Sequence, residues 1–304
     1  MKRRVFVTGA GGYLGSGIAA RLARGGFEVT GLVRDAARAS ALASAGVRPV
    51  VGDFEEPVGW DGALHNADVV VHAPWSAGDT ATTDQLALAL IRDAIQDGRV
   101  GRLLYASGLW VGGDSGERVV DENDPPAPLA IAHWRAAHEE VALDLTHFDA
   151  DVIVMRPGIV YGEARGLFGS WFAEARESHT VTVPGSGEQF WPLVHRDDMS
   201  EAFALAVEHG KPGERYHLCD ESQLRAREIG AAIAAVTDAE LRFEEAEHVI
   251  EEQGVCGEAL LASQKATAAK ARRALGWVPL HTNLAREAED LFREWSASRE
   301  ASVA

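Results

Sequence analysis

The chain has few cysteines and no long hydrophobic run, and both absences narrow its class. Its two cysteines, Cys219 and Cys256, lie far apart and match no metal-ligand spacing, so neither a disulfide scaffold nor a metal site is expected. Such cysteine usage suits a reducing cytoplasm. No apolar stretch approaches the roughly 20 residues of a membrane-spanning helix. The N-terminal apolar run stops at Gly9, which is too early for a secretory signal.

Basic residues are also scarce. The 304 residues include 29 Lys and Arg against 46 Asp and Glu, which gives a formal net charge of −17. Because an acidic surface repels phosphate backbones and anionic lipids, we expect neither nucleic acid nor a membrane as a partner. A content of 46% apolar and 25% charged residues is typical of a globular protein.

What the chain does have is a repeated strand–helix pattern in its first half. Short runs rich in Val, Leu and Ile lack in/out alternation, as expected for parallel strands buried on both faces. The predicted strands are 4–8, 28–33, 47–51, 68–72, 102–107 and 151–156, and the predicted helices between them are 12–24, 36–44, 57–66, 79–97 and 130–148. This alternation predicts an α/β fold with a doubly wound parallel sheet.

The second half is less regular and predicts a smaller, mostly helical lobe. Its predicted helices are 165–178, 197–208, 225–236, 246–253, 264–275 and 284–298, and its short strands are 180–183, 190–195 and 215–219. We expect a dinucleotide-binding domain at 1–160, with returning segments at about 193–220. Residues 161–192 and 221–304 would then form a C-terminal substrate-binding lobe.

A glycine-rich turn, Thr8-Gly-Ala-Gly-Gly-Tyr-Leu-Gly15, joins the first predicted strand to the first helix. Gly9 permits the tight turn, Gly12 lets the backbone approach a pyrophosphate, and Gly15 lets the helix pack on the strand. The helix N-terminus then offers unpaired N–H groups and its positive dipole end to the phosphates. This context predicts a dinucleotide site.

These residues resemble the short-chain dehydrogenase/reductase superfamily, in its extended or atypical, NAD-dependent epimerase/dehydratase-like branch. Further segments resemble that superfamily in order along the chain: Val51-Gly-Asp53, Val69-Val-Val-His-Ala-Pro74, Arg156-Pro-Gly-Ile-Val-Tyr-Gly162, Val194-His-Arg-Asp-Asp198 and Ala274-Leu-Gly-Trp-Val-Pro279. The resemblance implies an NAD(P)-binding Rossmann fold. The cofactor-binding residues that it implies are Gly9, Gly12, Tyr13, Leu14, Gly15, Asp53, Phe54, Ala73, Pro74, Ser107, Arg135, Pro157 and Ile159.

The end of the second predicted strand bears on the choice of cofactor. An NAD site usually has a carboxylate here that binds the ribose 2′-OH. In this chain Val33 is followed by Arg34, whose guanidinium suits the 2′-phosphate of NADP, and Arg38 lies one turn further on. We predict NADP(H) with Arg34 as a ligand. NAD is the alternative if Asp35 binds the ribose.

The resemblance also implies a catalytic serine and a Tyr-x-x-x-Lys pair, and here the chain departs from the pattern. The relevant helix reads Ala130-Ile-Ala-His-Trp-Arg-Ala-Ala-His-Glu-Glu140, which places Ile131 at the Tyr position and Arg135 at the Lys position. Ser107 fills the first serine position and Gly108 the second. Arg135 is expected to bind the nicotinamide ribose as the family Lys does, whereas Ile131 cannot transfer a proton.

The catalytic candidates are therefore substitutes. Ser107 is a candidate to polarise the substrate oxygen, or it is a turn serine. His133 is on the expected helix but only two residues from the Tyr position. Tyr161 and His195 belong to segments of the resemblance, and both are alternatively structural. A histidine has a suitable pKa for proton transfer near neutrality.

From these observations we expect an NADP(H)-dependent oxidoreductase that acts on a carbonyl or alcohol of a small organic substrate. The alternative enzyme is a nucleotide-sugar epimerase or dehydratase. Because the family Tyr is missing, a non-enzymatic NADP(H) sensor or scaffold is a further alternative. Tryptophans predicted around the mouth of the site suit an apolar or ring-bearing substrate, unless they only pack the lobe on the sheet; they are Trp75, Trp110, Trp134, Trp171 and Trp191. The resemblance also implies a homodimer formed partly by the predicted helix 79–97.

Overall fold

A computed structural model describes residues 2–73, 80–163 and 165–303, without the side chains of 301–303, and is built on one large parallel sheet. Its order is β11-β7-β5-β4-β1-β2-β3, and every neighbouring pair in it is parallel. The strands are β1 (Arg4–Thr8), β2 (Glu28–Val33), β3 (Arg48–Val51), β4 (Val69–His72), β5 (Arg102–Ala106), β7 (Asp151–Pro157) and β11 (Arg215–Leu218). The predicted doubly wound α/β fold is confirmed.

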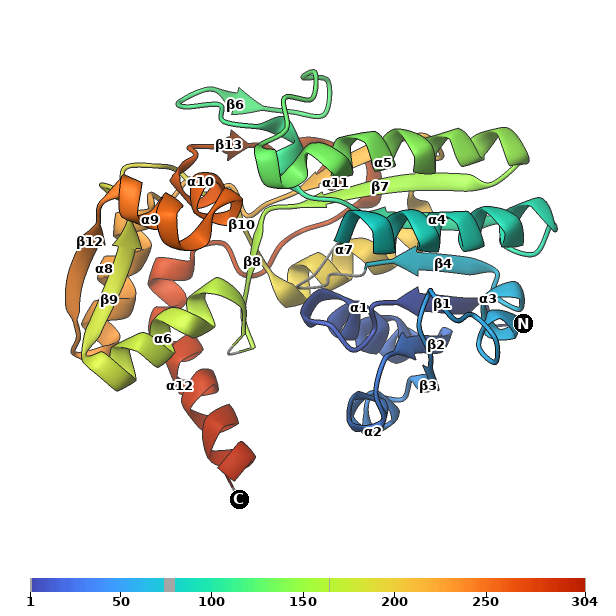
Figure 1. The fold of residues 1–304 in the computed structure, drawn as a ribbon, viewed down its shortest axis with the longest axis horizontal. Coiled ribbons are helices and arrows are strands. Elements are labelled where there is room, and N and C mark those ends of the chain that lie inside the picture. The colour runs from blue at the N-terminus through green and yellow to red at the C-terminus, as the bar shows by residue number, and fades with distance from the viewer. Residues whose placement is uncertain (1, 74–79, 164, 304) are drawn as a thin grey trace.

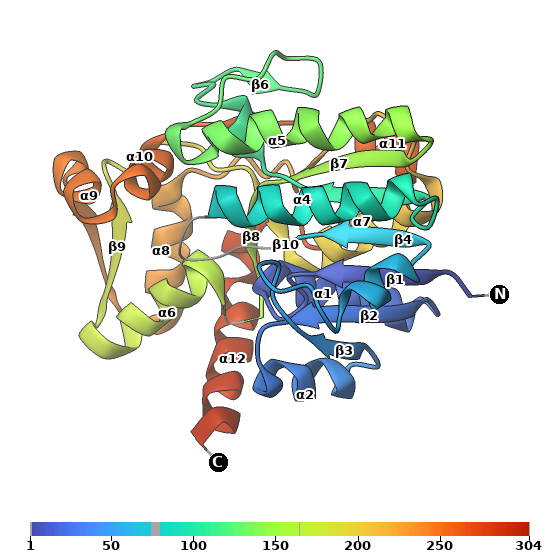
Figure 2. The same cartoon turned by 45° about the vertical axis from the view of Figure 1, so that its right-hand side comes forward.

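Helices cover both faces of this sheet (Figure 1, Figure 2). One face packs on α1 (Tyr13–Arg24), α2 (Ala36–Ser44), α7 (Arg196–His209) and α11 (Ala269–Leu275). The other packs on α3 (Asp61–His65), α4 (Thr80–Gln96) and α5 (His133–Asp144). The central strands between them are almost wholly buried: Val5, Val7, Val70 and Val71 are at most 1% exposed. Burial on both faces explains why the sequence shows continuous apolar runs instead of alternation.

The strand order reverses between β1 and β4, which places a crevice at the carboxyl ends of the strands. Short helical turns follow β5 and precede α5 there: η1 (Leu109–Gly112) and η2 (Ala130–Ala132). A third turn, η3 (Leu145–Phe148), continues α5. The predicted helix 130–148 is therefore divided into three pieces.

A second layer of helices lies beside the carboxyl ends of the sheet (Figure 1). It contains α6 (Gly166–Ser178), α8 (Ala226–Thr237), α9 (Ala246–Gln253), α10 (Val255–Leu261) and α12 (Leu284–Val303). Its own core is aromatic, with Phe168, Trp171, Phe172, Trp191 and Trp295 all buried. Between its segments the chain returns to the sheet through α7 and β11.

Three short parallel strand pairs tie the parts together. They are β8 (Ile159–Tyr161) with β10 (Leu193–His195), β9 (Thr180–Pro184) with β12 (Glu240–Glu244), and β6 (Val119–Val120) with β13 (Lys265–Ala266). The sequence prediction missed β6, β8, β12 and β13. It also extended two helices too far, because 57–66 is helical only from Asp61 and 264–275 only from Ala269.

No helix in the described part of the chain is both long enough and apolar enough to cross a membrane.

Candidate functional site

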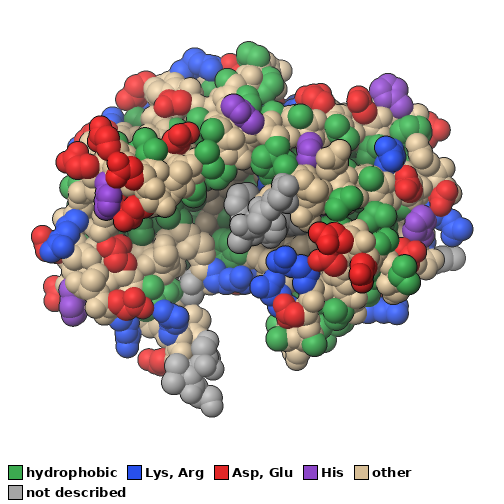
Figure 3. Space-filling view, in the orientation of Figure 1, with side chains coloured by type: hydrophobic (Ala, Val, Ile, Leu, Met, Phe, Trp, Pro, Cys, Tyr) green, Lys and Arg blue, Asp and Glu red, His purple; other side chains and the backbone are tan. Residues whose placement is uncertain are grey.

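A cavity of about 570 Å³ opens at the carboxyl ends of the central strands. Its wall includes the glycine loop, the ends of β4, β5 and β7, the turns η1 and η2, and residues that lead into α6. Figure 3 shows a hollow between the two halves of the molecule, with Lys and Arg side chains gathered at its lower edge. The described lining contains four arginines, namely Arg34, Arg38, Arg135 and Arg165, and no carboxylate or histidine.

The glycine loop is shaped so that its backbone lies against this cavity. Gly9 has φ +66°, a conformation that side chains disfavour. A Cβ on Gly15 would lie 2.3 Å from Gly9 O, and one on Gly12 would lie 3.1 Å from the same oxygen. No side chain caps the N-terminus of α1, whose first turn holds no acidic residue. The loop therefore fits a pyrophosphate for two reasons. Its glycines have no side chains that would block a phosphate from the backbone, and no carboxylate in the first turn neutralises the positive end of the α1 dipole.

A buried polar network holds the strand ends behind this loop. Thr8 Oγ1 lies 2.8 Å from His72 Nδ1 and accepts a hydrogen bond from Ala73 N. His72 Nε2 lies 3.0 Å from the Asp84 carboxylate, which also accepts a hydrogen bond from Tyr105 Oη. Burial alone would raise the pKa of Asp84, but its histidine partners outweigh burial and hold that pKa well below its usual range. Sequence reasoning missed this network, since its members come from four separate elements.

Two arginines that follow β2 contribute positive charge to the cavity wall. Arg34 and Arg38 both line the cavity. Asp35 instead caps α2, where its carboxylate accepts a hydrogen bond from Arg38 N and pairs with the Arg38 guanidinium at 3.3 Å. The carboxylate that would have favoured NAD is thus engaged in the helix cap.

The start of α5 supplies part of the wall, with the two residues that the sequence analysis aligned with the family Tyr and Lys. Ile131, just before the helix, and Arg135 both line the cavity. Arg135 is 8% exposed, donates a hydrogen bond from Nη1 to Ala106 O at 2.8 Å, and lies 4.3 Å from the Trp134 ring centroid. It retains further N–H groups for a ligand, because a guanidinium has five.

Ser107 lines the cavity, but its hydroxyl hydrogen is already committed. Ser107 Oγ donates to the carboxylate of Glu139, which is 1% exposed. The same carboxylate forms a two-point ion pair with Arg156 and lies 3.5 Å from Arg215 Nε. Because the hydroxyl hydrogen of Ser107 points to this carboxylate, the serine is oriented as part of a structural cluster. The expectation that it polarises a substrate oxygen is not supported by this geometry.

The structure does not bring the other predicted catalytic residues to the cavity. His133 is exposed on the surface of α5. Tyr161 is fully buried, its hydroxyl has no partner among the described residues, and it packs edge-on against His195. His195 stacks on His281 at 3.7 Å, and burial lowers the pKa of His195 to about 4.

Some of the predicted cofactor-binding residues line the cavity and others do not. Those that line the cavity are Gly12, Tyr13, Leu14, Arg34, Ala73, Ser107, Arg135, Pro157 and Ile159. Asp53 is exposed and accepts a hydrogen bond from Glu55 N, and Phe54 packs edge-on against Trp60, so neither belongs to this wall. Pro74 and Trp75 lie outside the described residues.

The predicted aromatic rim divides evenly among its four described tryptophans. Trp110 lines the cavity, and Trp134 contacts the arginine beside it. Trp171 and Trp191, however, are buried in the lobe with ring centroids 5.8 Å apart. The alternative that tryptophans pack the lobe therefore holds for these two.

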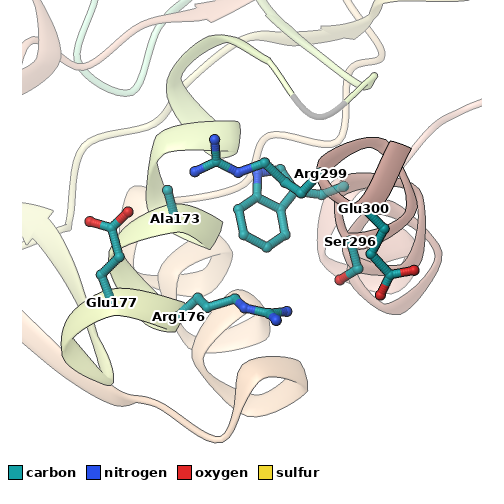
Figure 4. Close-up of a pocket in the computed structure, with 7 residues that line it drawn as sticks. Ala173, Arg176, Glu177, Ser296, Arg299 and Glu300 are labelled. Carbon is teal, nitrogen blue, oxygen red and sulfur yellow. The ribbon is translucent and has the colours of Figure 1, made fainter. Parts of the chain in front are cut away.

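A second cavity, of about 560 Å³, lies between α6 and α12 (Figure 4). Its lining residues are Ala173, Arg176, Glu177, Trp295, Ser296, Arg299 and Glu300. The Arg299 guanidinium lies over the Trp295 ring at 5.3 Å. This cavity includes neither the glycine loop nor any predicted site residue, whereas the first cavity is lined by both.

Comparison with known proteins identifies the family of the chain. The sequence profile of the NAD dependent epimerase/dehydratase family matches residues 5–219. An uncharacterized protein of Schizosaccharomyces pombe is 28% identical over 92% of this chain and 96% of its own length. A 4-hydroxy-2-methyl-3-oxo-4-farnesyl-3,4-dihydroquinoline-1-oxide ketoreductase of Stigmatella aurantiaca is 26% identical over 74% of this chain and 70% of its own. The crystal structure of dTDP-glucose 4,6-dehydratase from Streptomyces venezuelae, which holds NAD, has a TM-score of 0.82 at 22% identity and covers 98% of both chains.

The glycine loop yields a first prediction. We expect Gly15→Ala to abolish dinucleotide binding, because its Cβ would lie 2.3 Å from Gly9 O and force the loop open. Gly62→Ala is the matched control, since its Cβ would meet nothing within 4 Å. Titration of each variant with NADPH, followed by nucleotide fluorescence, measures the effect. Wild-type affinity in Gly15→Ala would contradict this account of the loop.

The Glu139 cluster yields a second. We expect Glu139→Gln to lower the free energy of unfolding by about 3–5 kcal/mol, because it leaves the buried Arg156 without its charge partner. Glu140→Gln, on the same helix, removes an exposed carboxylate that pairs with Arg215 and should change stability by less than about 1 kcal/mol. Urea unfolding of both variants measures the difference. Equal free energies of unfolding for the two variants would contradict the role of Glu139 as the charge partner of buried Arg156.

Proposed function

Because the chain belongs to the NAD-dependent epimerase/dehydratase family of NAD(P)-binding oxidoreductases, we propose that it is an NADPH-dependent ketone reductase. Its substrate is small, ring-bearing and largely apolar. The observation that carries the choice of reaction is the composition of the cavity wall, where the described residues include no carboxylate and no histidine. The ketoreductase activity named for the Stigmatella aurantiaca relative supports the same reaction class.

The choice of reaction follows from what each reaction needs. A dehydratase needs an acid and a base to eliminate water, and an epimerase needs a base that is used twice in each cycle. The described wall provides neither a carboxylate nor an imidazole, and Ile131 replaces the family Tyr. Ketone reduction needs only a hydride donor, a group that stabilises the developing alkoxide, and a proton that water can supply. This simpler demand matches the described wall.

The residues have distinct roles in the proposed reaction. The glycine loop holds the pyrophosphate, and Arg34 and Arg38 bind the 2′-phosphate. When bound, the reduced nicotinamide supplies the hydride. Arg135 lies beneath the end of β5 and stabilises negative charge on the substrate oxygen, because a buried guanidinium acts strongly in a site shielded from water. Leu109, Trp110 and Ile159 provide an apolar surface for the ring of the substrate.

The preference for NADPH is tested at Arg34. We expect Arg34→Gln to weaken NADPH binding about 10- to 100-fold and to leave NADH binding unchanged, because only NADPH carries the phosphate. Arg92→Gln, an exposed arginine on α4 that pairs with Asp93, is the control for net charge. Calorimetric titration with both nucleotides measures the change. Equal weakening of NADPH and NADH would contradict the assignment of Arg34 to the 2′-phosphate.

The reaction is tested by oxidation of NADPH with a panel of aromatic and alicyclic ketones. We expect turnover of some ketones, and a fall in kcat of about 100-fold in Arg135→Met, because one charged donor to the alkoxide is lost. His133→Ala, on the same helix but outside the cavity, should retain the wild-type rate. Tight NADPH binding without oxidation by any ketone of the panel would contradict the reductase and indicate a protein that only binds the cofactor.

A further inference from the structure

Gln264 lines the cavity from the segment that precedes β13, and its amide has a fixed orientation. Its Nε2 donates to two backbone oxygens, Leu109 O at 2.7 Å and Gly113 O at 2.9 Å. Both amide hydrogens are therefore used. The reversed amide would set Oε1 against two carbonyl oxygens, so Oε1 and Nε2 cannot exchange places.

The remaining polar atom of this side chain has no partner. Gln264 is 2% exposed, and its Oε1 is buried without a hydrogen bond to any described residue. A buried amide oxygen without a donor is unfavourable, so a ligand group that donates a hydrogen bond to it would bind more tightly. The neighbouring lining residues Leu109, Trp110 and Pro192 bring apolar side chains, and none of these three is placed as a donor to it.

We propose that Gln264 Oε1 accepts a hydrogen bond from a hydroxyl or N–H group of the substrate, and so selects ring-bearing ketones that carry such a donor. That the substrate is a ketone rests on the proposed reductase function. That the substrate carries a hydrogen-bond donor rests on Gln264 alone. A ligand without a donor leaves Oε1 unpaired and also displaces any water that had occupied the position. Such a ligand should bind about 10- to 100-fold more weakly than its hydroxylated counterpart.

The lobe provides a matched control in Gln189. Its Nε2 also donates to two backbone oxygens, Pro184 O at 2.9 Å and Leu260 O at 3.1 Å, and it is 7% exposed. Gln189 does not line the cavity. Replacing either glutamine removes two buried anchoring bonds. Of the two, only Gln264 lines the cavity and has a buried amide oxygen without a partner among the described residues.

The test uses a set of hydroxy-1-tetralones that differ in the position of the hydroxyl on the aromatic ring. The binding of each is compared with that of its methyl ether. Binding to the NADP⁺-loaded wild type, Gln264→Met and Gln189→Met is followed by quenching of tryptophan fluorescence. We expect at least one hydroxylated probe to bind the wild type about 10- to 100-fold more tightly than its ether. Gln264→Met should reduce this ratio to about one, and Gln189→Met should retain it even if its thermal stability falls.

Two results would overturn the inference. One is a wild type in which every hydroxylated probe and its ether bind equally, or in which no hydroxylated probe binds; this result needs no variant to fold. The other is a ratio that persists in Gln264→Met, which would assign Gln264 to anchoring of the η1 turn alone. Oxidation of NADPH by the same ketones is measured separately. Preferential binding of hydroxylated probes without oxidation of NADPH contradicts the reductase and supports the role of Gln264. Oxidation of NADPH without such a preference supports the reductase and contradicts the role of Gln264.

Discussion

The buried carboxylate of Glu139 is the constraint on which the architecture of the site depends. A carboxylate that is 1% exposed is tolerated only with charged and hydrogen-bonding partners, and these come from three neighbouring strands or their ends. Arg156 is on β7, Arg215 is on β11 and Ser107 follows β5. Their convergence fixes both the position and the rotation of α5. Arg135 lies one turn earlier on the same face and is therefore directed to the cavity.

A second polar network fixes α5 from its other side. His138 Nδ1 lies 2.8 Å from Asp84 of α4, and Asp84 is joined through His72 to Thr8 at the start of the glycine loop. The helix is thus connected to the loop by side chains and to the sheet by an ion pair. Neither connection uses residue 131. The position of α5 therefore does not depend on the side chain of Ile131, which the sequence analysis aligned with the family Tyr.

The sheet and the loop were predictable because their signals are local. β1, β2 and α2 have the predicted bounds, since a buried parallel strand or a capped helix is marked in its own residues. β12, with sequence ELRFE, has mixed polarity and is stabilised by β9, so no local pattern indicated it. The same limit applies to the site. His133 is two residues from Arg135, which turns it by about 200° on a helix, and the partners of Ser107 and Gln264 are distant in sequence.

The composition of the cavity also limits how a proton reaches the product of the proposed reaction. Arg135 stabilises an alkoxide but does not release a proton near neutral pH, because a guanidinium stays charged. Ser107 already donates its hydroxyl hydrogen bond to the Glu139 carboxylate, which forms an ion pair with Arg156. In the proposed reaction the proton must therefore come from solvent. An epimerase has a different requirement, since a base in its site must act twice in each cycle. A cavity whose described wall has no such base therefore favours a single reduction followed by release of the alcohol.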